Sequence, residues 1–127
     1  MKLFILLFTF IAFANANCSC TCDETRMIKF GQNTWNFLHT IATKYPTKPN
    51  VYDKQNIIGF MNTIASTYPC VKCRKHLKQN LNTYGYHVNN RTDISNWLCF
   101  LHNKVNEKTS KKIYDCNITK LDKMYLL

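Results

Sequence analysis

Two cysteines separated by two residues, Cys70 and Cys73, are the side chains of this sequence whose type and spacing best fit chemistry. At this spacing they can close a small, reducible disulfide. Pro69 suits the first turn of a helix, and the stretch from Cys73 to Leu81 has leucines at helical spacing. We therefore expect Cys70 at a helix start, where the helix dipole and nearby basic residues favour a thiolate. The pattern predicts thiol–disulfide exchange; a stabilising disulfide and half of a zinc site are the alternatives.

Three further cysteines alternate with polar residues near the start of the chain: Cys18, Cys20 and Cys22. The segment has no apolar neighbours to fold against, so we expect it to be mobile. A mobile dithiol can visit both a partner protein and the Cys70–Cys73 pair, which makes this segment a candidate electron shuttle. Metal binding and cross-linking between chains remain alternatives, because an odd number of cysteines leaves one without a partner.

The first residues resemble a targeting segment. Residues 3–13 are apolar except for Thr9, and the small residues Ala14-Asn15-Ala16 follow. This pattern predicts a secretory signal peptide that is removed after Ala16. The alternative is an uncleaved signal anchor, and only that alternative would attach the protein to a membrane. We divide the chain into a signal peptide (1–16), a cysteine tail (17–28) and a folded domain (29–127).

Composition limits the classes of function. The 127 residues indicate one domain, and seven cysteines behind a signal peptide indicate an oxidising compartment, either the endoplasmic reticulum lumen or the cell exterior. Asn90 and Asn117 begin glycosylation triplets that fit this compartment. The net charge of +10 comes from scattered lysines, and no acid lies between Asp53 and Asp93. The secretory signal argues against nucleic acid, whereas this basic stretch suits a nucleotide diphosphate or a thiolate.

Apolar periodicity predicts helices and no strand, and so an all-α four-helix bundle with a short fifth helix. The expected helices are 33–45, 52–67, 70–82, a fourth from residue 92 or 93 to about 108, and a short fifth that ends near Tyr125. Pro46 and Pro49 end the first helix. The expected caps are Asn33 or Thr34 for the first helix, Thr92 or Asp93 for the fourth, and Thr119 with Asp122 for the fifth.

Two pairs of side chains lie one helical turn apart and carry polar or aromatic groups. Trp35 and His39 place an indole beside an imidazole, although a buried core histidine would show the same pattern. His102 and Asn106 project together beside the apolar stripe of the fourth helix. Partly buried polar groups need partners, so these two either bond each other or bond a planar heterocycle.

Cys99 and Cys116 form a second candidate disulfide. Cys99 lies inside the fourth helix, which continues for about 14 Å beyond it. The seven residues before Cys116 can span about 23 Å, so the chain can fold back and close the bridge. We expect a structural disulfide, worth on the order of 3 kcal/mol in the chain-entropy account.

Four motifs carry a resemblance to a known family. They are Lys29-Phe30-Gly31 leading to Trp35-x-x-Leu38-His39, then Tyr68-Pro69-Cys70-x-x-Cys73, then Trp97-Leu98-Cys99-x-Leu101-His102-Asn103-x-Val105-Asn106, and finally Lys111 with Tyr114-Asp115-Cys116. In this order and spacing, residues 29–116 resemble the FAD-linked sulfhydryl oxidases of the Erv / augmenter of liver regeneration family.

The resemblance implies a disulfide-stapled helical bundle that holds FAD beside the Cys70–Cys73 disulfide, a homodimer, and oxygen as electron acceptor. It implies that Cys70 takes electrons from the tail dithiol, that Cys73 faces the flavin, and that Cys99–Cys116 is structural. No metal is implied. The cofactor contacts that it implies are Gly31, Gln32, Trp35, His39, Tyr68, Cys73, His102, Asn103, Val105, Asn106, Lys108, Lys111 and Tyr114.

The chain departs from the family pattern in three places. Gln32 replaces an arginine, Thr109-Ser110 replaces a Leu-Gly pair, and Tyr125 takes the place of a tryptophan in the last helix. The function expected is a thiol oxidase that makes disulfides in dithiol proteins, a thioredoxin-like oxidoreductase among them, and releases hydrogen peroxide. The alternatives are a non-enzymatic, secreted, disulfide-rich binding module with a basic face, and a redox-inert zinc protein.

Overall fold

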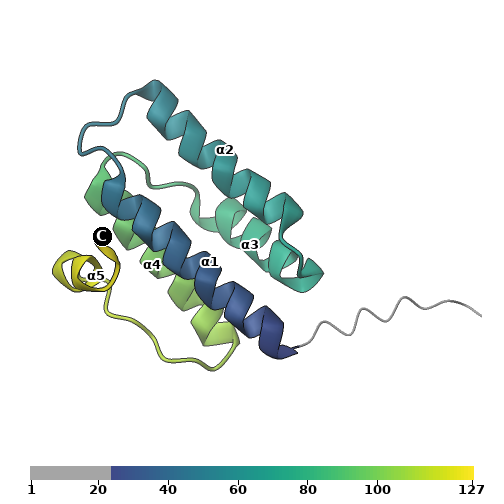
Figure 1. Ribbon diagram of the computed structural model, residues 1–127. Coiled ribbons are helices and arrows are strands. Elements are labelled where there is room, and N and C mark those ends of the chain that lie inside the picture. The colour runs from purple at the N-terminus through teal and green to yellow at the C-terminus, as the bar shows by residue number, and fades with distance from the viewer. Residues whose placement is uncertain (1–23) are drawn as a thin grey trace, which may run out of the picture.

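The computed structural model describes residues 24–127 and is entirely helical over that range (Figure 1). The signal peptide and the three tail cysteines lie outside the described residues. The helices are α1 (Glu24–Lys44), α2 (Val51–Thr67), α3 (Val71–Tyr84), α4 (Arg91–Lys108) and α5 (Ile118–Tyr125). The expected fold class, a four-helix bundle with a short fifth helix, is confirmed.

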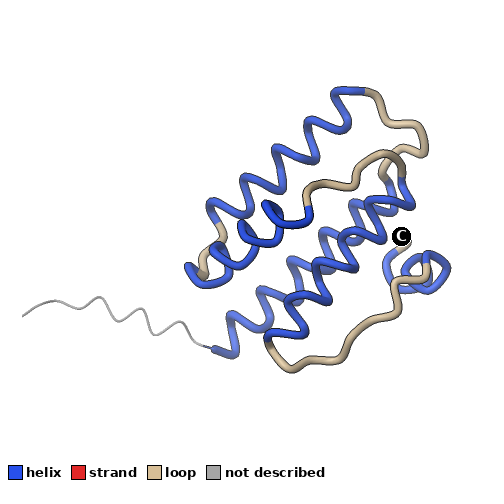
Figure 2. The backbone as a smooth tube through the Cα atoms, turned by 180° about the vertical axis from the view of Figure 1, so that it is seen from behind, coloured by secondary structure: helices blue, strands red, loops and turns tan. Residues whose placement is uncertain are grey.

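The helices pack in two pairs, α1 with α4 and α2 with α3, while α5 packs on both α1 and α4. Figure 2 shows the same arrangement from behind, with α5 outside the four long helices. The start of α1 and the turn from α2 into α3 lie at the same end of the bundle (Figure 1). The core between the pairs includes Leu38, Ala42, Met61, Ile94, Leu98 and Leu101, all nearly inaccessible to solvent.

Helix α1 begins at Glu24, nine residues before the expected start, so the expected caps Asn33 and Thr34 are wrong. Thr34 instead lies inside the helix and its hydroxyl donates to the Phe30 carbonyl at 2.8 Å. The added turns consist largely of good helix formers, but Ile28 and Phe30 are exposed and form no buried stripe that periodicity could detect. The boundary drawn between tail and domain after residue 28 consequently falls inside α1.

Asparagines, rather than the residues after them, cap the later helices. Asn90 caps α4 and accepts the Asp93 backbone N–H at 2.9 Å, so neither Thr92 nor Asp93 is the cap. Asn117 caps α5 by accepting the Thr119 N–H at 3.0 Å. The expected cap of Thr119 with Asp122 is therefore wrong, although α5 ends at Tyr125 as expected.

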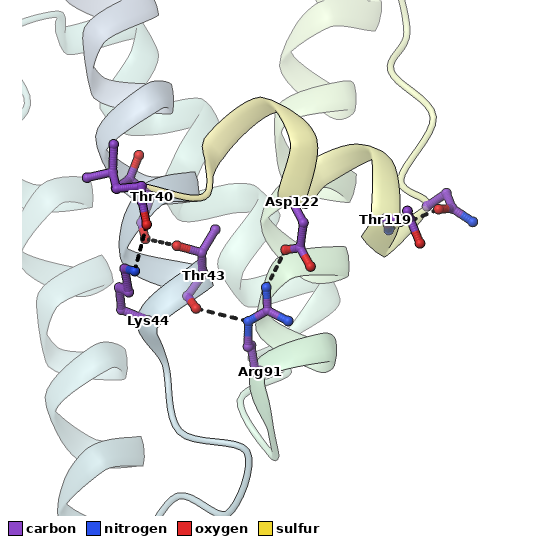
Figure 3. Close-up of polar contacts among 8 residues, drawn as sticks. Thr40, Thr43, Lys44, Arg91, Thr119 and Asp122 are labelled. Atoms are coloured by element: carbon purple, nitrogen blue, oxygen red, sulfur yellow. Dashed lines mark hydrogen bonds and ion pairs between the residues drawn. The ribbon is translucent and has the colours of Figure 1, made fainter.

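Arg91, the first residue of α4, ties three helices together (Figure 3). Its Nε donates to the carbonyl of Thr43, in the last turn of α1, at 2.9 Å. Its Nη2 forms an ion pair with the Asp122 carboxylate on α5. A cation at the carboxyl end of α1 also complements the helix dipole. Asp122 thus anchors α5 rather than capping it.

The expected structural disulfide is present. Cys99 on α4 and Cys116 are bonded, with their Cα atoms 5.6 Å apart. The bridge holds the return segment before α5 against α4 and so staples the short helix to the bundle. In the described part of the chain, no helix is both long and apolar enough to cross a membrane.

Candidate functional site

The Cys70–Cys73 disulfide lies at the start of α3, as the sequence predicts. Cys70 is the N-cap, and its sulfur accepts the Cys73 backbone N–H at 3.1 Å. Cys73 is exposed and Cys70 is half-buried. A disulfide that ends in solvent at a helix start can be attacked by a thiolate from outside, and the helix dipole stabilises the thiolate that leaves.

Tyr68 connects this disulfide to the first half of α1. Its ring packs on Phe30 with 5.3 Å between centroids. A Cβ added at Gly31 would meet the Tyr68 hydroxyl at 3.7 Å, an ordinary van der Waals distance. The protein alone therefore does not require glycine at this position. Tyr68, two residues before Cys70, therefore lies against Phe30 and Gly31, one turn before Trp35, and the neighbouring Gln32 is exposed.

Aromatic and imidazole rings from α1, α4 and α5 gather further along α1. Trp35 stacks on His102 with 4.2 Å between centroids and 5° between planes. His39 stacks on Tyr125 at 4.4 Å and 12°. Tyr114, from the segment before α5, lies 5.2 Å from the His102 ring. The sequence placed Trp35 beside His39, but the closer stacking partner of Trp35 is His102.

The two histidines are neutral at physiological pH. Burial, and secondarily His102, lowers the pKa of His39 to about 4. Burial, and secondarily Lys111, lowers the pKa of His102 to about 4. The His39 Nε2 and His102 Nδ1 atoms are 3.3 Å apart, and one neutral ring donates to the other. The pair is therefore uncharged, with 35° between the ring planes, and of the two rings His39 is buried and His102 half-buried.

Two asparagines of α4 hold the return segment in place. The Asn103 side chain makes two bonds to the backbone of Tyr114, one as acceptor and one as donor, both at 2.9 Å. Asn106 donates to the Lys112 carbonyl at 3.1 Å. His102 and Asn106 are therefore not each other's partners, because each bonds a different element. Asn103 and Asn106 act by positioning Tyr114 and its neighbours.

Exposed lysines lie near His102 of the ring cluster and near His76 of α3. Lys108 and Lys111 are exposed, and neither makes an ion pair within residues 24–127. The charge of Lys111 adds to burial in lowering the pKa of His102. The charge of Lys108 adds in the same way to burial in lowering the pKa of His76. Val105 is half-buried on α4, the helix that also carries Lys108. Planar rings bordered by free cations suit a ligand that joins flat heterocycles to an anionic group.

The predicted cofactor contacts fall into two groups in the structure, and the sequence analysis did not include His76. Gly31, next to Gln32, lies against Tyr68, which is two residues before Cys70, whereas His39 lies further along α1 beside His102 of α4. His76 was not singled out, although it lies one turn after Cys73, a spacing visible in the sequence. Within residues 24–127, no three His, Cys, Asp or Glu side chains are grouped to hold a metal ion.

Comparison with known proteins finds consistent similarity. A sequence model of a protein family, described as "Erv1 / Alr family", matches residues 32–126. The chain is 36% identical over 86 residues to "FAD-linked sulfhydryl oxidase ERV1" of Arabidopsis thaliana, covering 68% of this chain and 45% of that protein. It is 30% identical over 87 residues to "FAD-linked sulfhydryl oxidase" of African swine fever virus, covering 68% of this chain and 73% of that protein.

Solved structures show the same relationship. The "yeast Erv1 core" superimposes with a TM-score of 0.76 and 27% identity, covering 91% of this chain and 96% of that chain. The "FAD binding domain of Erv1 from Saccharomyces cerevisiae" gives a TM-score of 0.72 and 31% identity, covering 76% of this chain and 90% of that chain. The chain spans about half the length of the plant and yeast relatives that it matches, from 43% to 50%.

Proposed function

This chain belongs to the Erv1 / Alr family, and from that premise we propose that it is an FAD-linked thiol oxidase. In the reaction, two thiols and one dioxygen give one disulfide and one hydrogen peroxide. The observation that carries the proposal is the exposed Cys70–Cys73 disulfide, held at a helix start in the same bundle as a cluster of stacked rings. The comparisons favour this reading over a non-enzymatic binding module.

The residues of the site fit FAD. Its isoalloxazine and adenine rings suit the planar surfaces of Trp35 and the two neutral histidines, and its diphosphate suits Lys108 and Lys111. Tyr114 and Tyr125 add further ring surface, and Asn103 and Asn106 position the segment that carries Tyr114. When bound, FAD accepts two electrons from a dithiol and is reoxidised by oxygen.

The chain's own cysteines perform the exchange step. A substrate thiolate attacks the Cys70 sulfur and Cys73 leaves as a thiolate, which the helix dipole and nearby cations stabilise. A second substrate thiolate then attacks the mixed disulfide and releases Cys70. The substrate gains a disulfide, Cys70 and Cys73 become a dithiol, and the two substrate protons pass to solvent or to these cysteines. Exchange at Cys70 leaves Cys73 as the sulfur that faces the cofactor.

The cysteine tail is the proposed carrier of electrons from protein substrates. Two of Cys18, Cys20 and Cys22 would form a disulfide that a substrate dithiol reduces, and the resulting tail dithiol would then reduce the Cys70–Cys73 disulfide. The tail leads directly into α1, whose first half lies beside the Cys70–Cys73 disulfide. Replacing the three tail cysteines should therefore slow oxidation of protein dithiols while oxidation of small thiols continues.

Self-association is supported by apolar side chains on the outer surface of α1 and α2. Phe37 is 56% exposed and packs edge-on against Phe60 of α2 at 6.1 Å. Phe30, seven residues before Phe37 and so on the same side of α1, is also exposed. A homodimer through this face would bury them, and Phe37→Glu should convert the dimer to a monomer in sedimentation analysis.

The proposed location is the secretory pathway, in the endoplasmic reticulum lumen or outside the cell. The signal-like residues 3–16 and the glycosylation triplets at Asn90 and Asn117 support it. In both asparagines the side-chain oxygen accepts the capping bond, so the amide nitrogen, which would carry the glycan, is not the capping atom. Amino-terminal sequencing of the purified protein tests cleavage after Ala16; an intact start would indicate a signal anchor.

The test of the proposed function is the visible absorption spectrum of the purified protein, recorded before and after adding dithiothreitol without oxygen. We expect a flavin spectrum that bleaches with the thiol and returns with air. A flavin that dithiothreitol does not bleach would contradict electron transfer from the disulfide. A colourless, folded protein would favour the disulfide-rich binding module.

A further inference from the structure

The outer side of α3 is positively charged. The helix has four basic side chains and no acid. We call these four the basic face: Lys72, Arg74, Lys75 and Lys78. At about 100° per residue they lie within about 160° of the helix circumference, on the side away from the buried Asn80 and Leu81. The three lysines are exposed and Arg74 is half-buried, and none of the four makes an ion pair within residues 24–127.

Acids of the neighbouring helices leave this charge in place. On α2, which packs against α3, the acid is Asp53 in the first turn, at the opposite end of α2 from the disulfide (Figure 1). Near the end of α4, Glu107 is already paired with Lys104. At the start of α1, Glu24 is followed by the cation Arg26. A molecule that approaches the start of α3 therefore meets a net positive surface in the described part of the chain.

His76 shows that the positive charge extends from α3 to the end of α4. It lies one turn after Cys73 on α3. The pKa of His76 is below its ordinary value of 6.5; burial is the largest cause, and the charges of Lys108, Lys72 and Lys75 add to it. Lys108 is the last residue of α4, whereas the other two lysines belong to the basic face. Cations of two helices thus act together within a turn of the exchangeable sulfur.

The Cys70–Cys73 disulfide opens to solvent beside the basic face. Cys73 is exposed, and Val71, which lies between the two cysteines, is 69% exposed. Lys72 precedes Cys73 and Arg74 follows it. A substrate that brings a thiolate to Cys70 places the residues beside its own cysteine close to these cations, because Cα atoms two positions apart are within about 7 Å of each other. The charge of those substrate residues therefore affects the approach.

We propose that the basic face of α3 selects dithiol substrates whose cysteines are flanked by acidic side chains. The inference rests on the proposed thiol oxidase function and names the substrate class of that site. Acidic flanks are attracted to the face and basic flanks are repelled, which changes the rate of encounter and the choice of partner. Dithiothreitol carries no charged group beside its thiols and does not use the face.

The step on which the selection acts is the exchange at Cys70. A substrate thiolate forms a bond to the Cys70 sulfur, the Cys70–Cys73 bond breaks, and its electron pair leaves on Cys73. The second substrate thiolate attacks the substrate sulfur of the mixed disulfide, and Cys70 leaves as a thiolate. Two electrons pass from the substrate to the cysteine pair, and the two substrate protons pass to solvent or to the new thiolates.

The test uses three dithiol peptides with the same Cys-Gly-Gly-Cys core, flanked on each side by two glutamates, two glutamines or two lysines. Oxygen uptake gives kcat/KM for each peptide. The quantity compared between variants is the ratio for the acidic and the basic peptide. The peptides differ in thiolate content, but this difference is the same for every variant and cancels. A change in the reactivity of Cys73 cancels in the same way.

We expect K72E/K75E to lower the ratio about tenfold at low salt, because two weak attractions become repulsions for the acidic peptide and the reverse for the basic one. K72Q/K75Q should give an intermediate ratio. The matched control K48E/K123E changes the net charge equally on exposed lysines away from α3 and should leave the ratio unchanged. Flavin absorbance and dithiothreitol-driven oxygen uptake show that each variant is folded. A loss of the same size for all three peptides would overturn the selection, since the face would then act on the thiolate alone.

Salt provides a second readout. Raising the salt from about 0.01 M to about 0.15 M shortens the screening length from about 30 Å to about 8 Å, so the wild-type ratio should fall. In K72Q/K75Q this fall should be smaller. A wild-type ratio that does not change with salt would contradict selection by charge.

A measurement without turnover separates this inference from the proposed function. In a variant with Cys73→Ser and with serine at Cys18, Cys20 and Cys22, Cys70 is the free thiol, because Cys99 and Cys116 are bonded to each other. Its reaction with the same peptides, each activated as a mixed disulfide with thionitrobenzoate, is followed by the absorbance of the released thiolate. The acidic peptide should react faster than the basic one, and adding K72E/K75E should remove this preference. Equal rates would overturn the selection, whereas absence of oxygen uptake with dithiothreitol in the wild type would contradict the oxidase function.

Discussion

The imidazoles of His39 and His102 meet edge to edge, with 3.3 Å between Nε2 of the first and Nδ1 of the second. Each ring has an aromatic neighbour stacked on it, Tyr125 on His39 and Trp35 on His102. The residues come from helices far apart in the sequence, α1 and α4, and α5 adds Tyr125. This four-ring cluster belongs both to the candidate site and to the packing of the bundle, because His39 is buried and the other three rings are half-buried.

The neutral histidine pair predicts a pH-dependent stability. The unfolded chain protonates these imidazoles near pH 6.5, whereas the folded protein protonates them only near pH 4. Between these values the unfolded state binds more protons, so the free energy of unfolding falls as pH falls, by up to about 1.4 kcal/mol per pH unit for each proton. Urea unfolding of the holoprotein at several pH values measures this slope.

His39→Asn and His102→Asn should each reduce the slope, and His87→Gln, at an exposed position, is the matched control that should retain it. A free energy of unfolding that stays constant across this pH window would contradict the neutral pair. Loss of the slope in the His87→Gln control would also contradict the neutral pair as its source.

Cys73→Ser should reduce turnover with both dithiothreitol and protein dithiols to the background rate of thiol oxidation. The serine leaves no disulfide for a substrate to attack and no thiol to pass electrons onward. Oxygen uptake and peroxide release measure the loss, and the absorbance of bound flavin shows whether the cofactor site is intact. Full activity in this variant would rule out the exchange step at Cys70–Cys73.

Removing the Cys99–Cys116 disulfide should lower stability but leave turnover in place. The pair Cys99→Ala and Cys116→Ala opens a bridge between residues that are 17 apart in the sequence, which should lower the free energy of unfolding by about 3 kcal/mol. Turnover with dithiothreitol at low temperature should persist, because neither sulfur contacts the exchange site. Denaturant unfolding measures the free energy of unfolding, and oxygen uptake measures the turnover. Loss of activity in protein that remains folded would contradict a structural role of this disulfide.

Arg91→Ala should destabilise the anchor of α5. The change removes the bond to the Thr43 carbonyl and the half-buried ion pair with Asp122, so we expect a loss of about 2 kcal/mol. A double-mutant cycle with Asp122→Ala should show a coupling of about 1 kcal/mol. The exposed pair of Lys120 with Asp115 is the matched control, with a coupling of about 0.5 kcal/mol or less. Equal couplings in the two cycles would contradict the anchor.

Local pattern alone determined most of the helices and both disulfides. The apolar spacing around Leu38, Leu98 and Leu101 identified core faces, the two prolines predicted the end of α1, and the placement of Cys70 at a helix start was confirmed. These features depend on neighbours within a turn or two, where the periodicity of a helix acts directly on the sequence. The four motifs, read together, also identified the family.

Tertiary structure decided which polar groups pair. The sequence offered a bond between His102 and Asn106 as one of two alternatives and made Asp122 part of a cap. In the structure His102 bonds His39, Asn106 bonds the Lys112 carbonyl and Asp122 pairs with Arg91. Each true partner lies on another element or beyond a turn of the chain, and helical spacing carries no record of such a contact. The early start of α1 escaped detection for a related reason, since its exposed Ile28 and Phe30 form no buried face. Spacing along a helix therefore determines which side chains point the same way, and only packing between helices determines what they meet.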